Sequence, residues 1–326
     1  MQTAAGIRIR HQHDSDYDAI ARIRRAVFPD WPITAAQIRE FEAEVDPERF
    51  VFEKFVAEDR DSGEVVATGS YHQLPWSFHP DRYRLRLTVH PDWQGRGIGR
   101  AMMDRLLSEL RARGARWVKE IVREDHGRAI AFVRRYGFTE YSRSFESRLD
   151  VVRCDLAPFA HYARTVADLG ITLTTLAEEL RSRPDCLPAV YEMHCILDMG
   201  APRDDPGLPT PPAFVDFRRS GIDSPMALHD AYFLAKYGEM YVGESVLKRS
   251  DADPAWLHQE LTGVIPGCRG LGIATTLKVR TVEYAKAHGH RVIQTWNSSK
   301  NGPMLAINGK LGFVRQPAWL EFQLEL

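Results

Sequence analysis

Two segments of the chain place glycines directly after a strand-like run and before a helix-like run. The first reads LRLTVHPDWQGRGIGRAMMDRLL and the second reads ELTGVIPGCRGLGIATTLKVRTV. Glycine lets the backbone approach a ligand closely, and the free N–H groups and dipole at a helix N-terminus favour an anion. Each segment therefore predicts a turn that can hold a pyrophosphate group.

Two common nucleotide-binding motifs do not match these turns. A Walker loop needs Gly-Lys followed by Ser or Thr, which neither turn contains. The dinucleotide pattern G-x-G-x-x-G is not met by the first turn, Gly95-Arg96-Gly97-Ile98-Gly99. The turns therefore indicate a phosphate-bearing ligand of another class.

The two turns belong to an internal repeat. Residues 89–138 overlay residues 264–313 without a gap after a shift of 175 positions, and 13 of the 50 pairs are identical. Several identical pairs are glycines, which constrain the backbone. The repeat predicts two copies of one fold, in domains 1–152 and 153–326, with a linker helix at about 157–169.

Each copy is predicted to alternate strands and helices around its turn. In the first copy we expect strands at 7–11, 50–58, 64–73, 83–90 and 115–122, helices at 16–27, 34–45, 98–113 and 127–136, and a final strand pair to about 151. In the second we expect strands at 229–236, 240–249, 257–265 and 290–297, helices at 272–288 and 302–311, and a strand at the end. This order predicts an α/β fold with a mixed sheet.

The pattern of Arg or Gln, two residues, Gly, one residue, and Gly or Ala resembles the coenzyme A signature of the GCN5-related N-acetyltransferases (GNAT). The resemblance implies two tandem GNAT domains, with acetyl-coenzyme A as cosubstrate. The residues it implies for cofactor binding are Val264, Ile265, Arg269, Gly270, Leu271, Gly272, Ile273, Ala274, Asn301 and Asn308 in the second copy, and Val89, His90, Gln94, Gly95, Arg96, Gly97, Ile98 and Gly99 in the first.

The same resemblance implies roles for backbone and side chains near the thioester. In the family, the strand before the turn offers an N–H group to the thioester oxygen, which implies Val264 and Ile265 in the second copy and Val89 and His90 in the first. A stabilised oxyanion lowers the barrier to acyl transfer.

Two further positions lie in the helix that follows the next strand. An Asn that opens this helix often contacts the pantetheine arm in the family, and Asn301 stands there, whereas the first copy has His126. The usual acid is a tyrosine seven residues later, and this position holds Asn308 in the second copy and Val133 in the first. The chain departs from the family pattern at this acid.

The strand before the second turn carries candidate bases. Family members often use a carboxylate eleven residues before the signature Arg or Gln, and the residue there is His258. Because strand side chains alternate, we expect His258, Glu260 and Thr262 to share a face. The first copy offers Tyr83 and Leu85 instead, so the second copy is predicted to be catalytic, through His258 and Glu260; the alternative for both is a solvated strand face.

The acceptor is expected to be the amine of a small molecule. The loop from 200 to 212 contains Asp204 and Asp205, which hint at a cationic substrate. Two alternatives remain open: an acetyl-coenzyme A sensor or scaffold that transfers nothing, and a peptide N-terminal acetyltransferase. The assembly is expected to be a monomer formed by two similar domains, or a homodimer.

Composition bounds the remaining function classes. Forty-three Lys and Arg against 44 Asp and Glu give a net charge of −1, so we expect no nucleic-acid partner. No apolar run is long enough for a membrane span, and the N-terminus lacks the apolar core of a signal peptide, so we expect a cytoplasmic protein without a membrane partner. The four cysteines form no C-x-x-C pair, so neither a disulfide framework nor a metal site is expected.

Overall fold

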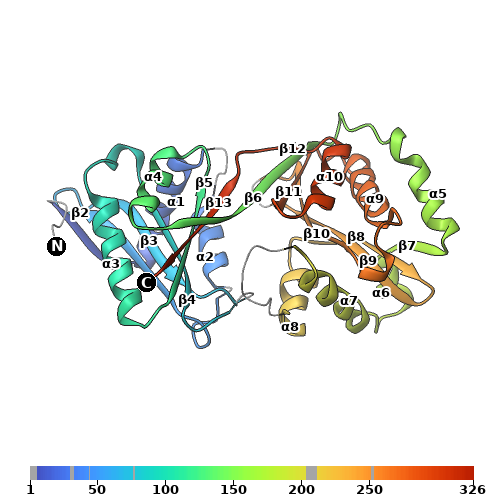
Figure 1. Ribbon diagram of the computed structural model, residues 1–326, viewed down its shortest axis with the longest axis horizontal. Coiled ribbons are helices and arrows are strands. Elements are labelled where there is room, and N and C mark those ends of the chain that lie inside the picture. Colours follow the sequence, from blue (N-terminus) through green and yellow to red (C-terminus); the bar gives the residue numbers. More distant parts are fainter. Residues whose placement is uncertain (1–5, 30–32, 44, 76–77, 203–210, 251–252) are drawn as a thin grey trace. The chain divides into compact units, whose positions relative to one another are not determined.

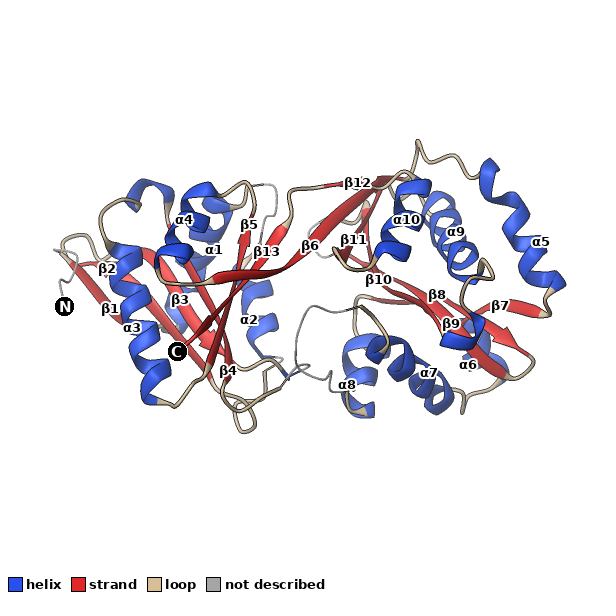
Figure 2. Cartoon of the chain, in the orientation of Figure 1, coloured by secondary structure: helices blue, strands red, loops and turns tan. Residues whose placement is uncertain are grey.

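The computed structural model covers residues 1–326 and describes all except 1–5, 30–32, 44, 76–77, 203–210 and 251–252 (Figure 1). Asp204 and Asp205 thus lie outside the described residues. The chain forms two compact units, each of which contains a mixed sheet with helices, as predicted (Figure 2). Unit 1 consists of Met1–Val122, His126–Tyr141 and Leu320–Leu326, and unit 2 of Arg123–Asp125 and Ser142–Trp319.

The sheet of unit 1 has the strand order β1-β2-β3-β4-β5-β13. Its first four strands are antiparallel neighbours, whereas β4 and β5 are parallel. The strands and helices from the first repeat are β1 (Ile7–His11), α1 (Tyr17–Val27), α2 (Ala35–Ala43), β2 (Phe52–Asp59), β3 (Val65–His72), β4 (Arg82–Val89), α3 (Ile98–Ala112), β5 (Trp117–Arg123), α4 (Gly127–Arg135) and β6 (Thr139–Asp150).

Helices cover both faces of this sheet. Successive residues of β2 point to opposite faces, so that Phe55 meets Arg105 of α3, whereas Val56 packs with Ile20 of α1. The buried side chains of α3 recur every three or four residues, which is the spacing of one helix face: Met102, Met103, Leu106, Leu107 and Leu110. The glycine turn therefore leads into a helix that its own apolar face anchors to the sheet.

The sheet of unit 2 has the strand order β7-β8-β9-β10-β11-β6, with β10 and β11 parallel. Successive residues of β9 again separate two cores, since Val242 packs on the side of α9 and Tyr241 on the side of α7. The elements are α5 (Ala160–Asp168), β7 (Ile171–Thr175), α6 (Leu176–Ser182), α7 (Leu187–Met199), α8 (Phe214–Phe217), β8 (Ala227–Tyr237), β9 (Met240–Arg249), β10 (Trp256–Val264), α9 (Ile273–Ala287), β11 (Val292–Ser298), α10 (Gly302–Leu311), β12 (Val314–Arg315) and β13 (Trp319–Glu325).

The two repeats exchange their last strands. Most of β6 follows the first repeat in sequence but pairs with β11 of unit 2, from Val292 opposite Asp150 to Ser298 opposite Ser144. Residues 320–326, at the end of the second repeat, complete the sheet of unit 1 beside β5. The sequence predicted two final strands before residue 151, whereas the structure has a single strand of 12 residues, β6. The boundaries of the two units also differ from the expected domain boundary at 152/153. A strand pattern reveals which face is buried but not which strand is the neighbour.

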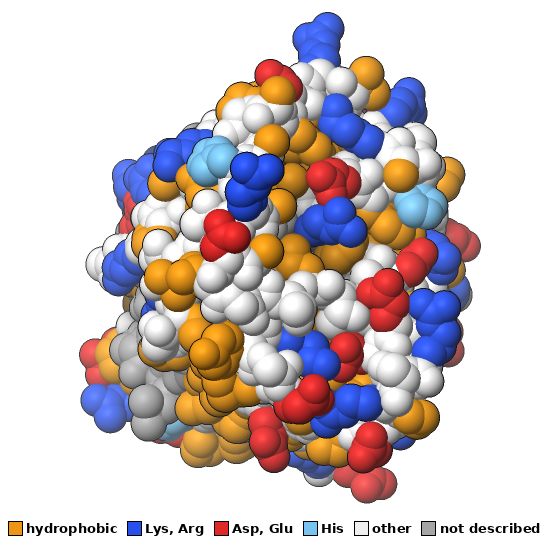
Figure 3. Space-filling view, turned by 90° about the vertical axis from the view of Figure 1, so that its right-hand side faces the viewer, with side chains coloured by type: hydrophobic (Ala, Val, Ile, Leu, Met, Phe, Trp, Pro, Cys, Tyr) orange, Lys and Arg blue, Asp and Glu red, His pale blue; other side chains and the backbone are white. Residues whose placement is uncertain are grey.

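Surface and composition features agree with a chain of nearly balanced charge. The face in Figure 3 mixes basic and acidic side chains without a large area of one sign. Among the described residues, no helix is both long and apolar enough to cross a membrane. All four cysteines are free, and the described part of the chain brings together no group of three or more His, Cys, Asp or Glu side chains suited to a metal ion.

Candidate active site

The two glycine turns have nearly the same backbone geometry. Gly97 and Gly272 occupy the left-handed region, with φ of 83° and 84°, immediately before α3 and α9. Gly95 and Gly270 are also left-handed, with φ of 83° and 79°. A Cβ atom added at Gly270 would meet nothing within 4 Å. The N-terminus of α9 is therefore open beside Gly270, and its backbone N–H groups fit a pyrophosphate.

The signature side chains stabilise the turn in both units. Arg269 donates from Nε to the carbonyl oxygen of Val264 at 3.0 Å, and Gln94 donates from Nε2 to the carbonyl oxygen of Val89 at 3.1 Å. Each contact ties the turn back to the last residue of the preceding strand. The expected cofactor-binding role of Arg269 and Gln94 therefore rests on the backbone shape that their side chains maintain.

Gly272 is also a close-packing position. A Cβ atom built there would lie 2.8 Å from Cδ1 of Tyr162, which belongs to α5. Real Cβ atoms do not approach a ring carbon so closely, so only glycine fits at this position. The sequence did not indicate this contact, because α5 lies about a hundred residues earlier in the chain.

The parallel strands separate just before each turn. In unit 2, β10 and β11 pair only from Trp256 opposite Val292 to Gln259 opposite Thr295. In unit 1, β4 and β5 pair only from Arg82 to Arg84 on the β4 side. Beyond these points the backbone of β10 and of β4 no longer pairs with β11 or β5, which leaves a wedge beside each strand.

Existing backbone hydrogen bonds exclude two of the four N–H groups that were expected to stabilise the oxyanion. The N–H groups of Ile265 and His90, both expected as donors to a thioester, already donate to the carbonyl oxygens of Val242 and Val66 at 2.9 Å. Antiparallel pairing alternates, so the N–H group of the preceding residue, Val264 in unit 2, faces away from β9. Val264, and Val89 in the same position of unit 1, are therefore the remaining donors of the four expected residues.

A β-bulge distinguishes the two units. The pairing of β10 with β9 shifts between Gln259 and Thr262, whereas the pairing of β4 with β3 is unbroken through its described length. Gln259 and Thr262 both contact Ser245, at 3.2 Å and 2.8 Å, so they share one face of the sheet. His258 lies on the opposite face. The expectation that His258, Glu260 and Thr262 share a face is wrong for Thr262, because the bulge reverses the alternation.

Glu260, inside the bulge, is exposed to solvent, and His258, two residues earlier on β10, is half-buried. The His258 ring lies 6.0 Å from the ring of Trp296 on β11. A bulge often redirects a side chain at an active site. The two candidate bases thus lie where β10 leaves β11, a few residues before the turn.

The helix-opening positions differ between the units in the way the sequence suggested. Asn301 is the N-cap of α10, and its Oδ1 accepts a hydrogen bond from the backbone N–H of Met304 at 3.3 Å. His126, the N-cap of α4, makes no such side-chain bond and instead stacks on Phe28 at 5.1 Å. Asn308 is buried inside α10.

A buried histidine–carboxylate pair next to β10 was not predicted from the sequence. Glu244 on β9 is fully buried and contacts Nδ1 of His194 at 2.7 Å, while the Tyr232 hydroxyl donates to it at 2.5 Å. Burial lowers the pKa of His194, but the hydrogen bond and charge of Glu244 raise it by more. Glu244 lies opposite Gly263 on β10, so a charged pair faces the same side of the sheet as α7. Only the structure brings these distant residues together.

Residues 17–138 match the model of the Acetyltransferase (GNAT) family. This part of the chain is therefore a GNAT acetyltransferase domain. The match lies in the first repeat, and the second repeat has the same glycine turn, parting strands and following helix. Two GNAT folds in one chain therefore account for the internal repeat.

Relatives of known name match parts of this chain. Mycothiol acetyltransferase of Thermobifida fusca is 36% identical over 134 residues, which span 36% of this chain and 38% of that protein. Mycothiol acetyltransferase of Beutenbergia cavernae is 49% identical over 53 residues, which span 16% of this chain and 18% of that protein. The matched segments thus cover well under half the length of these relatives.

Solved structures resemble the whole chain. A GCN5-related N-acetyltransferase from Sphaerobacter thermophilus has a TM-score of 0.73 at 17% identity and covers 98% of this chain and 96% of that one. A tandem GNAT protein from the clavulanic acid biosynthesis pathway has a TM-score of 0.70 at 19% identity, with 98% of both chains covered. At such identities the likeness establishes the fold, including its tandem arrangement.

The GNAT fold of unit 1 encloses titratable side chains that sequence reasoning also missed. His72 on β3, Arg84 and Arg86 on β4, and Glu120 on β5 form this group. Three buried atoms have no hydrogen-bond partner among the described residues: His72 Nδ1, Arg84 Nε and Glu120 Oε2. Burial raises the pKa of Glu120 to about 8, although Arg86 and Arg84 oppose the shift. Glu120 is therefore mostly protonated at neutral pH.

We expect Glu120 to make the folded protein less stable as the pH rises. Its pKa is higher in the folded than in the unfolded chain, so its stabilising contribution is complete below about pH 4 and is lost as the pH rises through about 8. The free energy of unfolding of the wild type should therefore fall between about pH 5 and about pH 9 by roughly 2–4 kcal/mol more than that of Glu120→Gln, as measured by chemical denaturation. The control is Glu40→Gln on α2, which is exposed. Parallel pH profiles for the wild type and Glu120→Gln would contradict the assignment.

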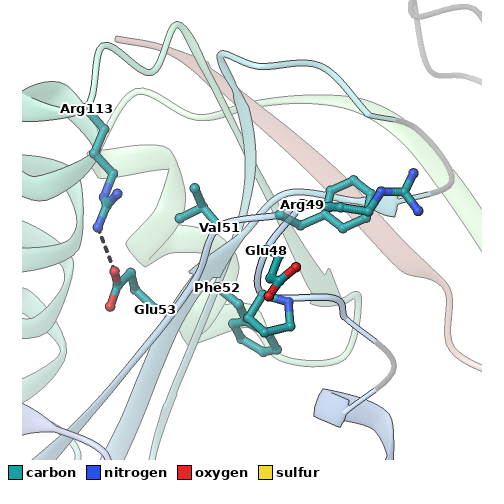
Figure 4. Close-up of a pocket in the computed structure, with 8 residues that line it drawn as sticks. Glu48, Arg49, Val51, Phe52, Glu53 and Arg113 are labelled. Carbon is teal, nitrogen blue, oxygen red and sulfur yellow. Dashed lines mark hydrogen bonds and ion pairs between the residues drawn. The ribbon is translucent and has the colours of Figure 1, made fainter.

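A separate hollow of about 320 Å³ lies at the far end of α3 in the GNAT fold of unit 1 (Figure 4). Arg113 and Glu53 flank it and form an ion pair at 2.6 Å. Arg113 caps the C-terminus of α3, whereas the glycine turn lies at the N-terminus of this 15-residue helix. The hollow is therefore about 20 Å from the turn and is not part of the expected cofactor site.

Proposed function

We propose that this protein transfers the acetyl group of acetyl-coenzyme A to the amine of a small molecule, and that transfer takes place in unit 2. The observation that carries the proposal is the β-bulge in β10. The bulge holds the exposed Glu260, two residues after His258, where β10 and β11 part and a few residues before a complete signature turn. Unit 1 has an unbroken strand at this position, with Tyr83 and Leu85 where unit 2 has the two candidate bases.

The backbone of unit 2 supplies the binding half of the reaction. The amides from 269 to 274 hold the pyrophosphate, with Gly270 and Gly272 providing the left-handed conformations that aim them outward. The N–H of Val264 lies on the open edge of β10, and it donates to the thioester oxygen as negative charge develops there. Asn301 opens α10 beside the pantetheine arm.

The side chains of β10 supply the proton chemistry. An amine attacks the thioester carbon only in its neutral form, so a base must remove its proton. Histidine and glutamate are both residue types that act as general bases. Either group takes the amine proton, directly or through a water molecule, while the C–N bond forms and the C–S bond breaks.

Unit 1 is proposed to bind acetyl-coenzyme A without catalysing transfer. Its turn has the same left-handed glycines, Gly95 and Gly97, and the same side-chain tie from Gln94 to the strand. Its N-cap residue is His126 in place of an asparagine, and no bulge interrupts its strand. We also retain the proposal that the protein is a cytoplasmic monomer of two similar domains, or a homodimer.

The acceptor is proposed only as a class, a small-molecule amine. The relatives called mycothiol acetyltransferase are named after a small-molecule substrate, but they share only part of their length with this chain. A purified sample should therefore be mixed with acetyl-coenzyme A and a panel of polyamines, amino sugars, amino acids and one N-terminal peptide, and release of free thiol should be measured.

The expected result is thiol release with at least one small amine and none with the peptide. Calorimetry with acetyl-coenzyme A alone should show binding. Binding without release for any amine would favour the sensor or scaffold alternative, and release with the peptide only would favour a peptide acetyltransferase. Absence of binding would refute the whole proposal.

A further inference from the structure

A lysine is buried inside unit 2, and no acidic side chain among the described residues pairs with it. Lys278 lies in the middle of α9, and only 1% of its surface is exposed. Its Nζ donates to Oδ1 of Asn308 on α10 at 2.5 Å and lies 4.6 Å from the centre of the Phe313 ring. Burying an ammonium group is costly, so such a position needs an explanation.

The lysine is the inner end of a chain of hydrogen bonds. Asn308 donates from Nδ2 to Oδ1 of Asn297 on β11 at 2.7 Å. Pairing between β10 and β11 ends at Thr295, so Asn297 lies beyond the point where the strands part. The chain Lys278–Asn308–Asn297 therefore reaches from the core to the part of β11 that no longer pairs with β10.

Burial is the cause of the shifted pKa of this lysine. It lowers the pKa of Lys278 to about 7, and no charged side chain among the described residues shifts it in either direction. The polar side chains near the lysine on α9 and β10, such as Thr281 and Gln259, are uncharged and bond to each other. Lys278 is therefore partly protonated at neutral pH and responds readily to a nearby anion.

The first repeat provides a comparison within the same chain. A shift of 175 positions places Lys278 on Met103, Asn308 on Val133 and Asn297 on Val122. All three residues of unit 1 are buried, with 1%, 3% and 6% exposed. The same fold thus accepts an entirely apolar set, so folding does not require the lysine and the two amides.

We propose that Lys278, Asn308 and Asn297 replace the missing tyrosine acid by stabilising the coenzyme A thiolate as it leaves. This inference rests on the proposed function. Asn308 donates its second Nδ2 hydrogen to the sulfur, Asn297 orients that amide, and Lys278 polarises it through Oδ1. Lys278 and Asn297 are positioning residues, since they act through Asn308.

The reaction balances without a separate acid. The amine gives its proton to the base on β10, the C–N bond forms, and the electrons of the broken C–S bond remain on sulfur. The thiolate leaves as an anion and takes a proton from water after release. Because the developing anion favours the protonated lysine, Lys278 and the sulfur titrate as a coupled pair.

The test uses coenzyme A itself as the probe and needs no acceptor. The pKa of the bound thiol is measured from the ultraviolet absorbance of the thiolate, in the Gly95→Asp protein so that unit 2 is reported. We expect the bound thiol to titrate at least one pH unit below free coenzyme A, whose thiol resembles a free cysteine of pKa about 8.5. In Lys278→Met and in Asn308→Val the value should return toward that of the free thiol.

Each variant carries the residue of unit 1, so both should fold, and circular dichroism checks this. Affinity of Lys278→Met for coenzyme A at about pH 6, where the free thiol is protonated, should stay within about threefold of the parent, because Lys278 acts only through Asn308. The triple change Lys278→Met, Asn308→Val and Asn297→Val reproduces the full apolar set of unit 1, and the pKa of the bound thiol should then equal that of free coenzyme A. An unshifted thiol pKa in the parent, or a lowering that persists in the triple variant, would overturn the inference alone. If the wild-type protein shows no binding of coenzyme A at all, the proposed function is overturned as well.

Discussion

Gly270→Asp is expected to weaken acetyl-coenzyme A binding to unit 2 by about tenfold to a hundredfold relative to Gly270→Asn. The position is left-handed and has open space around the missing Cβ, and aspartate and asparagine are the residues that best tolerate this conformation. The two variants therefore strain the backbone alike and differ in one negative charge. At about 4 Å from a pyrophosphate, that charge costs several kcal/mol before screening by salt. Isothermal titration calorimetry measures the difference.

Gly270 is a better position for this test than Gly272. A larger residue at Gly272 would collide with Tyr162, so loss of binding could reflect a damaged fold. The matched pair in unit 1 is Gly95→Asp and Gly95→Asn, at a φ of 83°. If both units bind, each aspartate variant should weaken one of the two binding events and leave the other unchanged. Equal affinities for Gly270→Asp and Gly270→Asn would place the pyrophosphate elsewhere.

The double change His258→Ala and Glu260→Ala is expected to lower turnover by about a hundredfold or more while affinity for acetyl-coenzyme A is retained. General-base catalysis contributes roughly 10²–10⁴-fold, and the two side chains offer alternative routes for the same proton. Each single change should therefore cost less than the double change. Turnover is measured with the best amine from the panel.

The matched control for the double change is Tyr83→Phe in unit 1, at the position that corresponds to His258. This variant should leave turnover unchanged, since a phenol is not a base near neutral pH. Full activity of the double variant would remove His258 and Glu260 from the mechanism. Activity lost in Gly95→Asp but kept in Gly270→Asp would move catalysis to unit 1.

The local elements of this fold could be predicted from the sequence because their causes are local. The glycines of the turns need a left-handed backbone, and Gly95, Gly97, Gly270 and Gly272 all have one. The helix expected at 98–113 forms at Ile98–Ala112, since its apolar residues follow helical spacing. The internal repeat in the sequence predicted the tandem arrangement of two similar folds.

The features that escaped prediction depend on contacts between distant residues. The bulge in β10 arises from pairing with β9, and alternation along one strand does not reveal it. Lys278 falls on a helix face whose partner, Asn308, is 30 residues away. The resemblance identified the position of Asn308, but only the structure shows what its amide contacts.

The strand exchange has a consequence for how the protein is made. The sheet of unit 1 is completed by Leu320–Leu326, which follow β5 by almost the whole of unit 2, and Phe322 in this segment is fully buried. During synthesis β5 therefore keeps an unpaired edge until residues 320–326 have been made, whereas β6 is made before the other strands of unit 2. Unit 1 thus completes its sheet only after the chain of unit 2 has been synthesised, and until then its open edge can pair with a neighbouring molecule instead.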